Sequence, residues 1–217
     1  MAASARSYGV AAALLLALGL TACTSGDDTP APTGPVVQLG APGEENRTMS
    51  PEEAAGIEQP EHTDADIAFM QMMIVHHDQA ITMTEWVDER TTDRDLRLMA
   101  ERMRISQEDE TEFMASWLRD RGTPLQGDHL GHAAGMMPGM LTEDQLAELE
   151  AATGEDFERL FLEYMIQHHS GALQMVADLR AAGGGMEISV GRFANDVEGD
   201  QGIEIARMQQ MLAALGS

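Results

Sequence analysis

The segment FMQMMIVHH (residues 69–77) is followed 92 residues later by FLEYMIQHH (residues 161–169). The correspondence continues beyond the paired histidines, since Ala80 matches Ala172. A His-His pair beside methionines, repeated at a fixed spacing, predicts two copies of one helical unit that bring four imidazoles together. Imidazole and thioether groups form the ligand set of copper and other soft metals. The repeat therefore points to metal binding.

A second helix repeats as well, at a spacing of 94 residues. Gln107 and Glu110 in the first copy correspond to Gln201 and Glu204 in the second copy. Each unit is therefore a helical hairpin, in which a His-His helix is followed by a Gln-x-x-Glu helix. Two such hairpins packed together form a four-helix bundle, whose core is a common place for metal sites built from facing side chains. We expect an all-α protein, an antiparallel four-helix bundle made of two repeated hairpins.

Helix start and stop signals place these elements along the chain. Thr63 with Asp66 forms a capping pattern, Thr153 is expected to cap a second long helix, and Gly122 ends the first hairpin. No segment alternates with period 2, so no strands are expected. The predicted domain covers residues 62–217, with hairpin one at about 63–121, a loop and a short helix at about 122–152, and hairpin two at about 153–215.

The first residues are typical of an export signal. Arg6 precedes an apolar run (residues 10–20) that is too short to span a bilayer as a mature helix, so residues 1–22 are expected to be a signal peptide. Leu20-Thr21-Ala22-Cys23 resembles a bacterial lipobox, in which the cysteine is acylated and becomes the mature N-terminus. An ordinary secretory signal with an incidental cysteine is the alternative. Cys23 is the only cysteine, so an intramolecular disulfide is excluded and a thiolate metal ligand is not expected.

The segment after Cys23 and the net charge restrict the partners of the chain. Residues 24–61 are rich in Pro, Gly, Thr, Asp and Glu, which predicts a flexible tether over residues 23–61. Without residues 1–22 the chain has 12 Arg, no Lys and 37 acidic residues, a net charge near −25. This charge speaks against binding to nucleic acid and against docking on anionic lipid through the protein surface. Contact with a membrane is expected through the lipid anchor only.

The paired histidines are the candidate metal ligands. Adjacent residues on a helix point about 100° apart, so one histidine of each pair should face the bundle centre and the other its edge or the neighbouring helix. The predicted ligand set is His76, His77, His168 and His169, with Met73 and Met165 one turn before His77 and His169. The alternative is a structural pairing of histidine with Glu110 or Glu204. Both can hold, because a metal-bound imidazole normally donates its other N–H to a carboxylate.

A second cluster lies in the loop between the hairpins. Glycines and Pro138 predict that residues 128–140 are not helical. The candidate ligands of this second soft-metal site are His129, His132, Met136, Met137 and Met140. We expect weaker binding there, because a mobile loop must first be ordered. The alternative is a linker whose methionines lie down on the bundle.

Taken together, these motifs resemble the family called domain of unknown function 305. The resemblance covers residues 62–217 and rests on the paired histidines, the Met-Pro-Gly-Met loop and the Gln-x-x-Glu helices. It implies a ferritin-like fold, export or membrane anchoring, and binding of copper and related ions outside the cytoplasm in connection with copper tolerance. It also implies that the four paired histidines are ligands with Met73 and Met165 nearby. One site departs from the repeat: Ser170-Gly171 stands where the first copy has Asp78-Gln79, so any role of Asp78 beside the ligands is not duplicated.

The main hypothesis is an extracytoplasmic lipoprotein, anchored to the cell membrane, that binds copper for sequestration, tolerance or delivery to an unknown partner. Thioether ligands favour Cu(I), and silver and zinc are the alternatives. Ligating imidazoles must be neutral, so affinity should weaken below about pH 6.5, the ordinary histidine pKa. A second hypothesis is an envelope interaction module with structural histidines. A ferritin-like di-metal oxidase is disfavoured because the chain has no Glu-x-x-His motif, and no other catalytic arrangement is visible, so an enzyme is not expected.

Overall fold

The computed structural model describes residues 34–38, 43, 45–127 and 137–216. The chain divides into two compact units, residues 1–57 and residues 58–217. Helices dominate the described residues, and this confirms the all-α fold class. None of the helices in this described part combines the length and the apolar character that a membrane crossing requires.

Three short elements lie in the described part of the first unit. Strand β1 (Val36–Gln38) pairs antiparallel with β2 (Arg47–Met49), and helix α1 (Pro51–Ala55) follows. Ser50 caps α1, because its hydroxyl accepts the backbone N–H of Glu53 while the Glu53 carboxylate accepts the N–H of Ser50. The sequence predicted no regular structure in this segment, so these elements correct that expectation. A sheet of two short strands carries little stability by itself.

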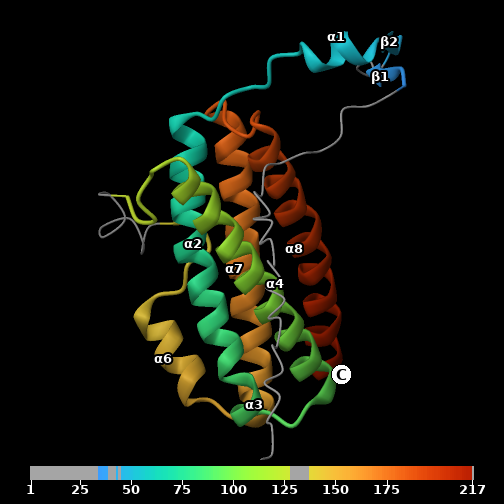
Figure 1. The fold of residues 1–217 in the computed structure, drawn as a ribbon. Helices are drawn as coiled ribbons and strands as arrows, with labels where there is room; N and C mark the ends of the chain where they lie inside the picture. The colour runs from blue at the N-terminus through green and yellow to red at the C-terminus, as the bar shows by residue number, and fades with distance from the viewer. Residues whose placement is uncertain (1–33, 39–42, 44, 128–136, 217) are drawn as a thin grey trace, which may run out of the picture. The chain divides into compact units, whose positions relative to one another are not determined.

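The second unit is the predicted bundle (Figure 1). Hairpin one consists of α2 (Asp64–Glu85), the short α3 (Val87–Arg90) and α4 (Arg94–Asp120). Hairpin two consists of α7 (Gly154–Ala181) and α8 (Ile188–Leu215). Helix α6 (Glu143–Ala151) comes between the hairpins in the chain and packs against α7. The observed ends of the helices agree with the predicted hairpins to within a few residues.

Caps begin most of these helices as the sequence predicts. The Thr63 hydroxyl accepts the N–H of Asp66, and the Asp66 carboxylate accepts the N–H of Thr63 at 2.7 Å. Thr142 caps α6 in the same way. The predicted cap at Thr153 is wrong, because its side chain makes no capping hydrogen bond. The chain instead enters α7 through Gly154 at φ +60°, a conformation that glycine adopts without strain.

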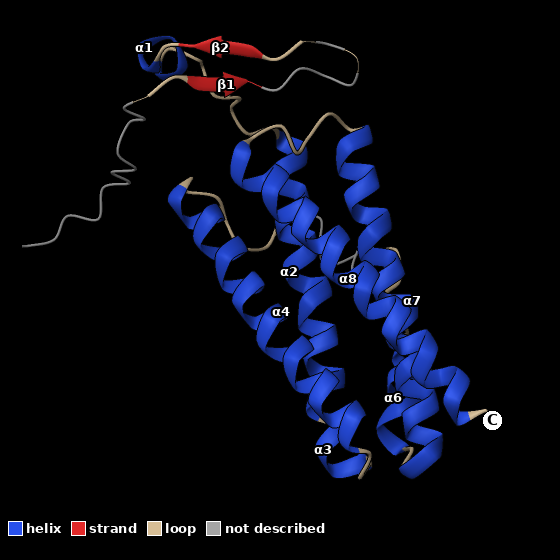
Figure 2. Ribbon diagram, turned by 90° about the vertical axis from the view of Figure 1, so that its right-hand side faces the viewer, coloured by secondary structure: helices blue, strands red, loops and turns tan. Residues whose placement is uncertain are grey.

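Helices α2 and α7 form the interface between the two hairpins (Figure 2). They run in opposite directions, since the Asp66 carboxylate near the start of α2 accepts the N–H of Gly185, just after α7, at 2.6 Å. At the other end of the interface the hydroxyl of Thr91, just after α3, hydrogen-bonds to Glu158 near the start of α7. Asp66 and Glu158 occupy equivalent positions in the repeat. The two hairpins are therefore tied together by matching carboxylates at both ends.

A polar layer divides the apolar core into two clusters. In α2, Phe69 and Ile74 belong to the first cluster and Ala80 and Met83 to the second, with the histidine pair between them. In α4, α7 and α8 as well, buried polar residues separate side chains of one cluster from side chains of the other cluster. The buried polar residues of this layer are His76, His77, Gln107, His168, His169 and Gln201. All predicted ligand histidines therefore lie in one cross-section of the bundle.

Candidate metal centre

The structure brings the four histidines together and buries all of them completely, with 0% exposure. His76 and His168 meet where α2 contacts α7, and their ring centroids are 3.8 Å apart. His77 and His169 point instead toward α4 and α8, where each Nε2 atom lies 2.7 Å from a carboxylate oxygen. The neighbours in each pair thus face different helices, as the 100° rotation per residue requires.

The outer pair, His77 and His169, is held by the two glutamates that the sequence singled out. The Nε2 atom of His77 binds Glu110, and that of His169 binds Glu204. Glu110 is itself held by the hydroxyl of Ser106 at 3.1 Å. These contacts are the ones expected of a carboxylate that orients a metal-binding imidazole. The same contacts would be found if each histidine and glutamate formed only a structural polar pair.

The inner pair, His76 and His168, is held by backbone carbonyl groups. The Nε2 atom of His168 lies 2.9 Å from the carbonyl oxygen of His76, and the Nε2 atom of His76 lies 3.0 Å from that of Pro138. A carbonyl oxygen only accepts, so Nε2 carries the proton in both rings. In a neutral imidazole the other nitrogen, Nδ1, then holds a free lone pair.

The Nδ1 atoms of all four histidines are buried and have no hydrogen-bond partner within the described structure. The side-chain amides of Gln107 and Gln201, one in each hairpin, are buried and unpartnered as well. A buried polar atom without a partner costs about 1–3 kcal/mol of stability. The unpartnered atoms of this layer therefore reduce the stability of the fold, and the four Nδ1 atoms are acceptors that the described protein groups leave free.

The protonation of the inner pair differs from the sequence-based expectation. Burial and, to a smaller extent, the neighbouring His77 lower the pKa of His76 to about 3, although the hydrogen bond to Pro138 opposes this shift. Burial and the neighbouring His76 likewise lower the pKa of His168 well below its ordinary value. Both imidazoles therefore stay neutral at pH 6.5. A weakening of metal affinity below about pH 6.5 would therefore not come from protonation of these two candidate ligands.

The remaining predicted residues surround the layer in different ways. Met73 and Met165 are fully buried, but Met73 belongs to the first apolar cluster and Met165 to the second. The two thioethers thus flank the layer from opposite sides. Asp78 lies at the surface. Its carboxyl group is nevertheless partly shielded from solvent, which raises its pKa, while the nearby His77 lowers it. Among the described residues, no three His, Cys, Asp or Glu side chains converge closely enough to hold a metal ion in this arrangement.

Three residues that hold the loop against the histidine helices were not recognised in the sequence: Gln79, Pro138 and Gly171. The Gln79 amide binds both backbone groups of Leu141, at 2.7 and 3.1 Å. Gly171 lets the loop approach α7, because a Cβ atom there would lie 2.1 Å from the Pro138 oxygen. This explains why Gln79 and Gly171 differ although they are equivalent in the repeat: both contact a loop that occurs only once. A glycine in the middle of a helix was the available signal.

The structure describes only two of the five residues of the predicted loop site. His129, His132 and Met136 lie outside the described residues. Met137 is buried in the first apolar cluster, and Met140 is partly buried against it. For these two methionines the structure therefore shows the alternative, in which the loop packs on the bundle.

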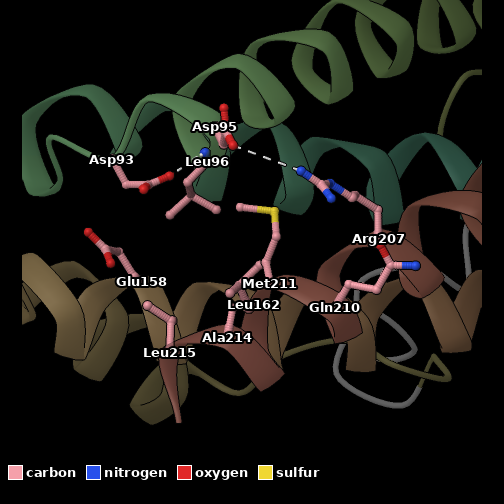
Figure 3. Close-up of a pocket in the computed structure, with 10 residues that line it drawn as sticks. All are labelled: Asp93, Asp95, Leu96, Glu158, Leu162, Arg207, Gln210, Met211, Ala214 and Leu215. Atoms are coloured by element: carbon pink, nitrogen blue, oxygen red, sulfur yellow. Dashed lines mark hydrogen bonds and ion pairs between the residues drawn. The ribbon is translucent and has the colours of Figure 1, made fainter. Parts of the chain in front are cut away.

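A separate cavity of about 260 Å³ lies where α4 and α7 begin and α8 ends (Figure 3). Its carboxylates already have partners. Asp93 caps α4, Glu158 binds the Thr91 hydroxyl, and Asp95 lies 4.0 Å from the guanidinium group of Arg207. None of the predicted ligands lines this cavity, so it is not a candidate for the metal centre.

Comparisons with known proteins agree with the repeat and the fold. The sequence pattern of the family "Domain of unknown function (DUF305)" matches residues 66–212. A DUF305 protein of Streptomyces coelicolor, described as a candidate secreted protein, is 30% identical, with a TM-score of 0.65 over 70% of this chain and 94% of its own. A DUF305 fragment from Deinococcus radiodurans is 31% identical, with a TM-score of 0.63 over 71% and 99%.

The protein CopM shares the fold at lower identity. Its Cu(II)-bound form is 27% identical, with a TM-score of 0.57 over 69% of this chain and 96% of its own. CopM has also been solved in Cu(I)-bound and silver-bound forms. A search of curated protein sequences found no match. The family pattern spans most of the chain, and the chain therefore belongs to the DUF305 family.

Proposed function

We propose that this protein binds copper in the histidine layer, with Cu(I) as the preferred ion and Ag(I) as a chemical substitute. The observation that carries the proposal is the set of four buried Nδ1 atoms without partners, contributed equally by the two hairpins. The family relative CopM, solved with Cu(I), Cu(II) and silver, supports copper or silver as the metal. Zn(II) is the alternative ion, because imidazole alone would also serve it.

The side chains present fit such an ion. His76 and His168 are adjacent and neutral, and a neutral imidazole is the form that ligates. Glu110 and Glu204 would fix the rings of His77 and His169 through Nε2 and leave Nδ1 for the metal. Met73 and Met165 would add soft thioether ligands from either side of the layer. Because no three His, Cys, Asp or Glu side chains converge among the described residues, a site with three imidazole ligands would need side-chain rotation within the layer.

We further propose that the protein acts outside the cytoplasm as a binding protein, not an enzyme. In this proposal Cys23 is lipidated after removal of residues 1–22, and the membrane is contacted only through this anchor. The bound copper would be sequestered for tolerance or passed to a delivery partner. The described secreted character of the Streptomyces relative supports an extracytoplasmic location.

One structural observation favours the competing function, an interaction module with structural histidines. All four Nε2 atoms are satisfied by protein partners, and each histidine would keep this bond without a metal. The two functions differ in whether the unpartnered Nδ1 atoms bind an ion. A metal titration therefore separates them.

The test is an anaerobic titration of the full chain with Cu(I) in competition with a chromophoric Cu(I) chelator. Replacing His76→Asn together with His168→Asn should abolish tight binding, since it removes both inner ligands. Replacing Glu110→Gln together with Glu204→Gln should weaken it by roughly 10–100-fold, the usual effect of losing a group that orients a metal ligand. The exposed His62→Gln serves as the control and should bind as the unmodified chain does.

The result that overturns the proposal is unchanged Cu(I) affinity in the His76→Asn, His168→Asn chain when its helical circular dichroism signal is intact. The histidines would then be structural, and the interaction module would be adopted. Parallel titrations with Cu(II), Ag(I) and Zn(II) establish the preferred ion. Equal or tighter binding of Zn(II) would contradict a role for the thioethers.

A further inference from the structure

A second cavity, of about 330 Å³, lies on the other side of the histidine layer from the cavity in Figure 3. It is bounded by the first half of α2, the last part of α7 and the loop residues Met137 and Pro138. Three of its lining residues are methionines, and they come from three separate segments: Met72 from α2, Met137 from the loop and Met175 from α7. These residues are distant in sequence, and only the fold brings them to one cavity.

These three methionines pack in or against the first apolar cluster, but they also border empty space. Methionine fills irregular gaps in a core and thereby removes empty space. Met70 and Met73 do this, since both are completely buried. Met137 and Met175 are only 6% and 4% exposed, yet together with the partly buried Met72 they border a cavity that is large enough for a ligand.

We propose that this cavity is a second soft-metal site, in which the thioethers of Met72, Met137 and Met175 bind one Cu(I) or Ag(I) ion. Thioethers select soft monovalent ions, while Cu(II) and Zn(II) prefer nitrogen and oxygen ligands. The residues that line the cavity include neither histidine nor cysteine. Their one charged group is the carboxylate of Asp178, which would offset the single positive charge of the ion.

The cavity adjoins the histidine layer through Pro138. This residue lines the cavity, and its carbonyl oxygen lies 3.0 Å from the Nε2 atom of His76. Pro138 alone therefore separates the cavity from His76. The choice of soft metal rests on the proposed copper-binding function, but the site has its own ligands and can be tested separately.

The test uses the full chain labelled with ¹³C on the methionine methyl groups and titrated with Ag(I), which does not change oxidation state. The methyl resonances of Met72, Met137 and Met175 should shift together as one ion binds. Single Met→Leu variants identify the three resonances. The variant Met72→Leu, Met137→Leu, Met175→Leu should bind one Ag(I) fewer per chain, because leucine conserves volume but has no sulfur.

Two controls separate this site from the histidine layer. The variant Met83→Leu, Met99→Leu, Met103→Leu, which alters buried methionines of the other apolar cluster, should keep the full number of Ag(I) ions. The His76→Asn, His168→Asn chain should lose the ion of the layer and keep the three methyl shifts. If this histidine variant loses no ion while the cavity variant loses one, the proposed function fails and the thioether site stands.

Three results would overturn the thioether site. The first is the absence of a joint shift of the three methyl resonances in the unmodified chain, a measurement that does not depend on how the variants fold. The second is an unchanged number of bound Ag(I) ions in the folded cavity variant. The third is an equal shift of these resonances on addition of Zn(II), which would show that the effect is not specific for a soft ion.

Discussion

His76 and His168 remain neutral in the folded protein at a pH where a free imidazole takes up a proton. Burial is the first cause of both lowered pKa values. In the unfolded chain each imidazole binds its proton near the ordinary pKa of about 6.5. The unfolded state therefore binds more protons than the folded state below this pH, and the free energy of unfolding decreases as the pH falls.

This linkage predicts how stability depends on pH when a chelator has removed all metal. As the pH falls below about 6.5, His76 should lower the free energy of unfolding on the order of 1 kcal/mol per pH unit until its pKa of about 3 is reached, and His168 should act in the same direction. Urea unfolding at several pH values should therefore give a flatter dependence for His76→Asn, His168→Asn than for the unmodified chain. The exposed His62→Gln should keep the original slope. An equal slope in all three chains would show that the buried imidazoles do take up protons.

At the scale of the helices, two glycines lie in the middle of long helices, one tightly packed and the other with open space beside it. Gly171 lies in the middle of α7, and the loop backbone at Pro138 and Gly139 packs directly on it. Gly199 lies in the middle of α8, and a Cβ atom there would meet nothing within 4 Å. Helix propensity alone favours alanine at both positions by about 1 kcal/mol. The space around each glycine decides whether a change to alanine stabilises the protein.

We therefore expect opposite effects from the same substitution. Gly199→Ala should stabilise the protein by roughly 0.5–1 kcal/mol. Gly171→Ala should destabilise it by about 1–3 kcal/mol, because the added methyl group displaces the loop backbone and with it the Pro138 contact to His76. Thermal and urea unfolding of both variants measure the two changes. A stabilised Gly171→Ala chain would mean that the loop is not held against α7.

At the scale of the whole molecule, the helical domain carries the candidate metal sites, and we propose that the first residues direct the protein to its location. The chain is strongly acidic, so its surface gives no attraction to anionic lipid. Association with a membrane would then depend on Cys23, which lies outside the described residues. A single substitution at Cys23 therefore tests the proposed anchor.

Replacing Cys23→Ala should move the protein from the membrane fraction to the soluble extracytoplasmic fraction of a bacterial host. Ser25→Ala, two residues away, should leave it in the membrane fraction. Fractionation with immunodetection measures the distribution, and mass spectrometry of the unmodified protein should show an acylated N-terminus at residue 23. An uncleaved protein in the cytoplasm would remove the basis for both the anchor and the extracytoplasmic role.

The sequence by itself determined the all-α class, the ends of the long helices and the gathering of the four histidines. Capping residues and helical periodicity are local signals, so they could be read directly. The repeat predicted that the four imidazoles come together, because two like hairpins that pack against each other form one four-helix bundle. The pairing of histidine with Glu110 and Glu204 was open as an alternative for the same reason.

Only the tertiary structure decided the details that depend on how the hairpins are oriented. The antiparallel contact of α2 with α7 places Met73 and Met165 on opposite sides of the layer, although their sequence contexts are alike. The docking of the single loop decided the partner of His76, the need for Gly171 and the cavity of three methionines. Periodicity specifies which face of a helix is buried, but the rotation and direction of packed helices and the path of a loop follow from side-chain packing between segments distant in sequence.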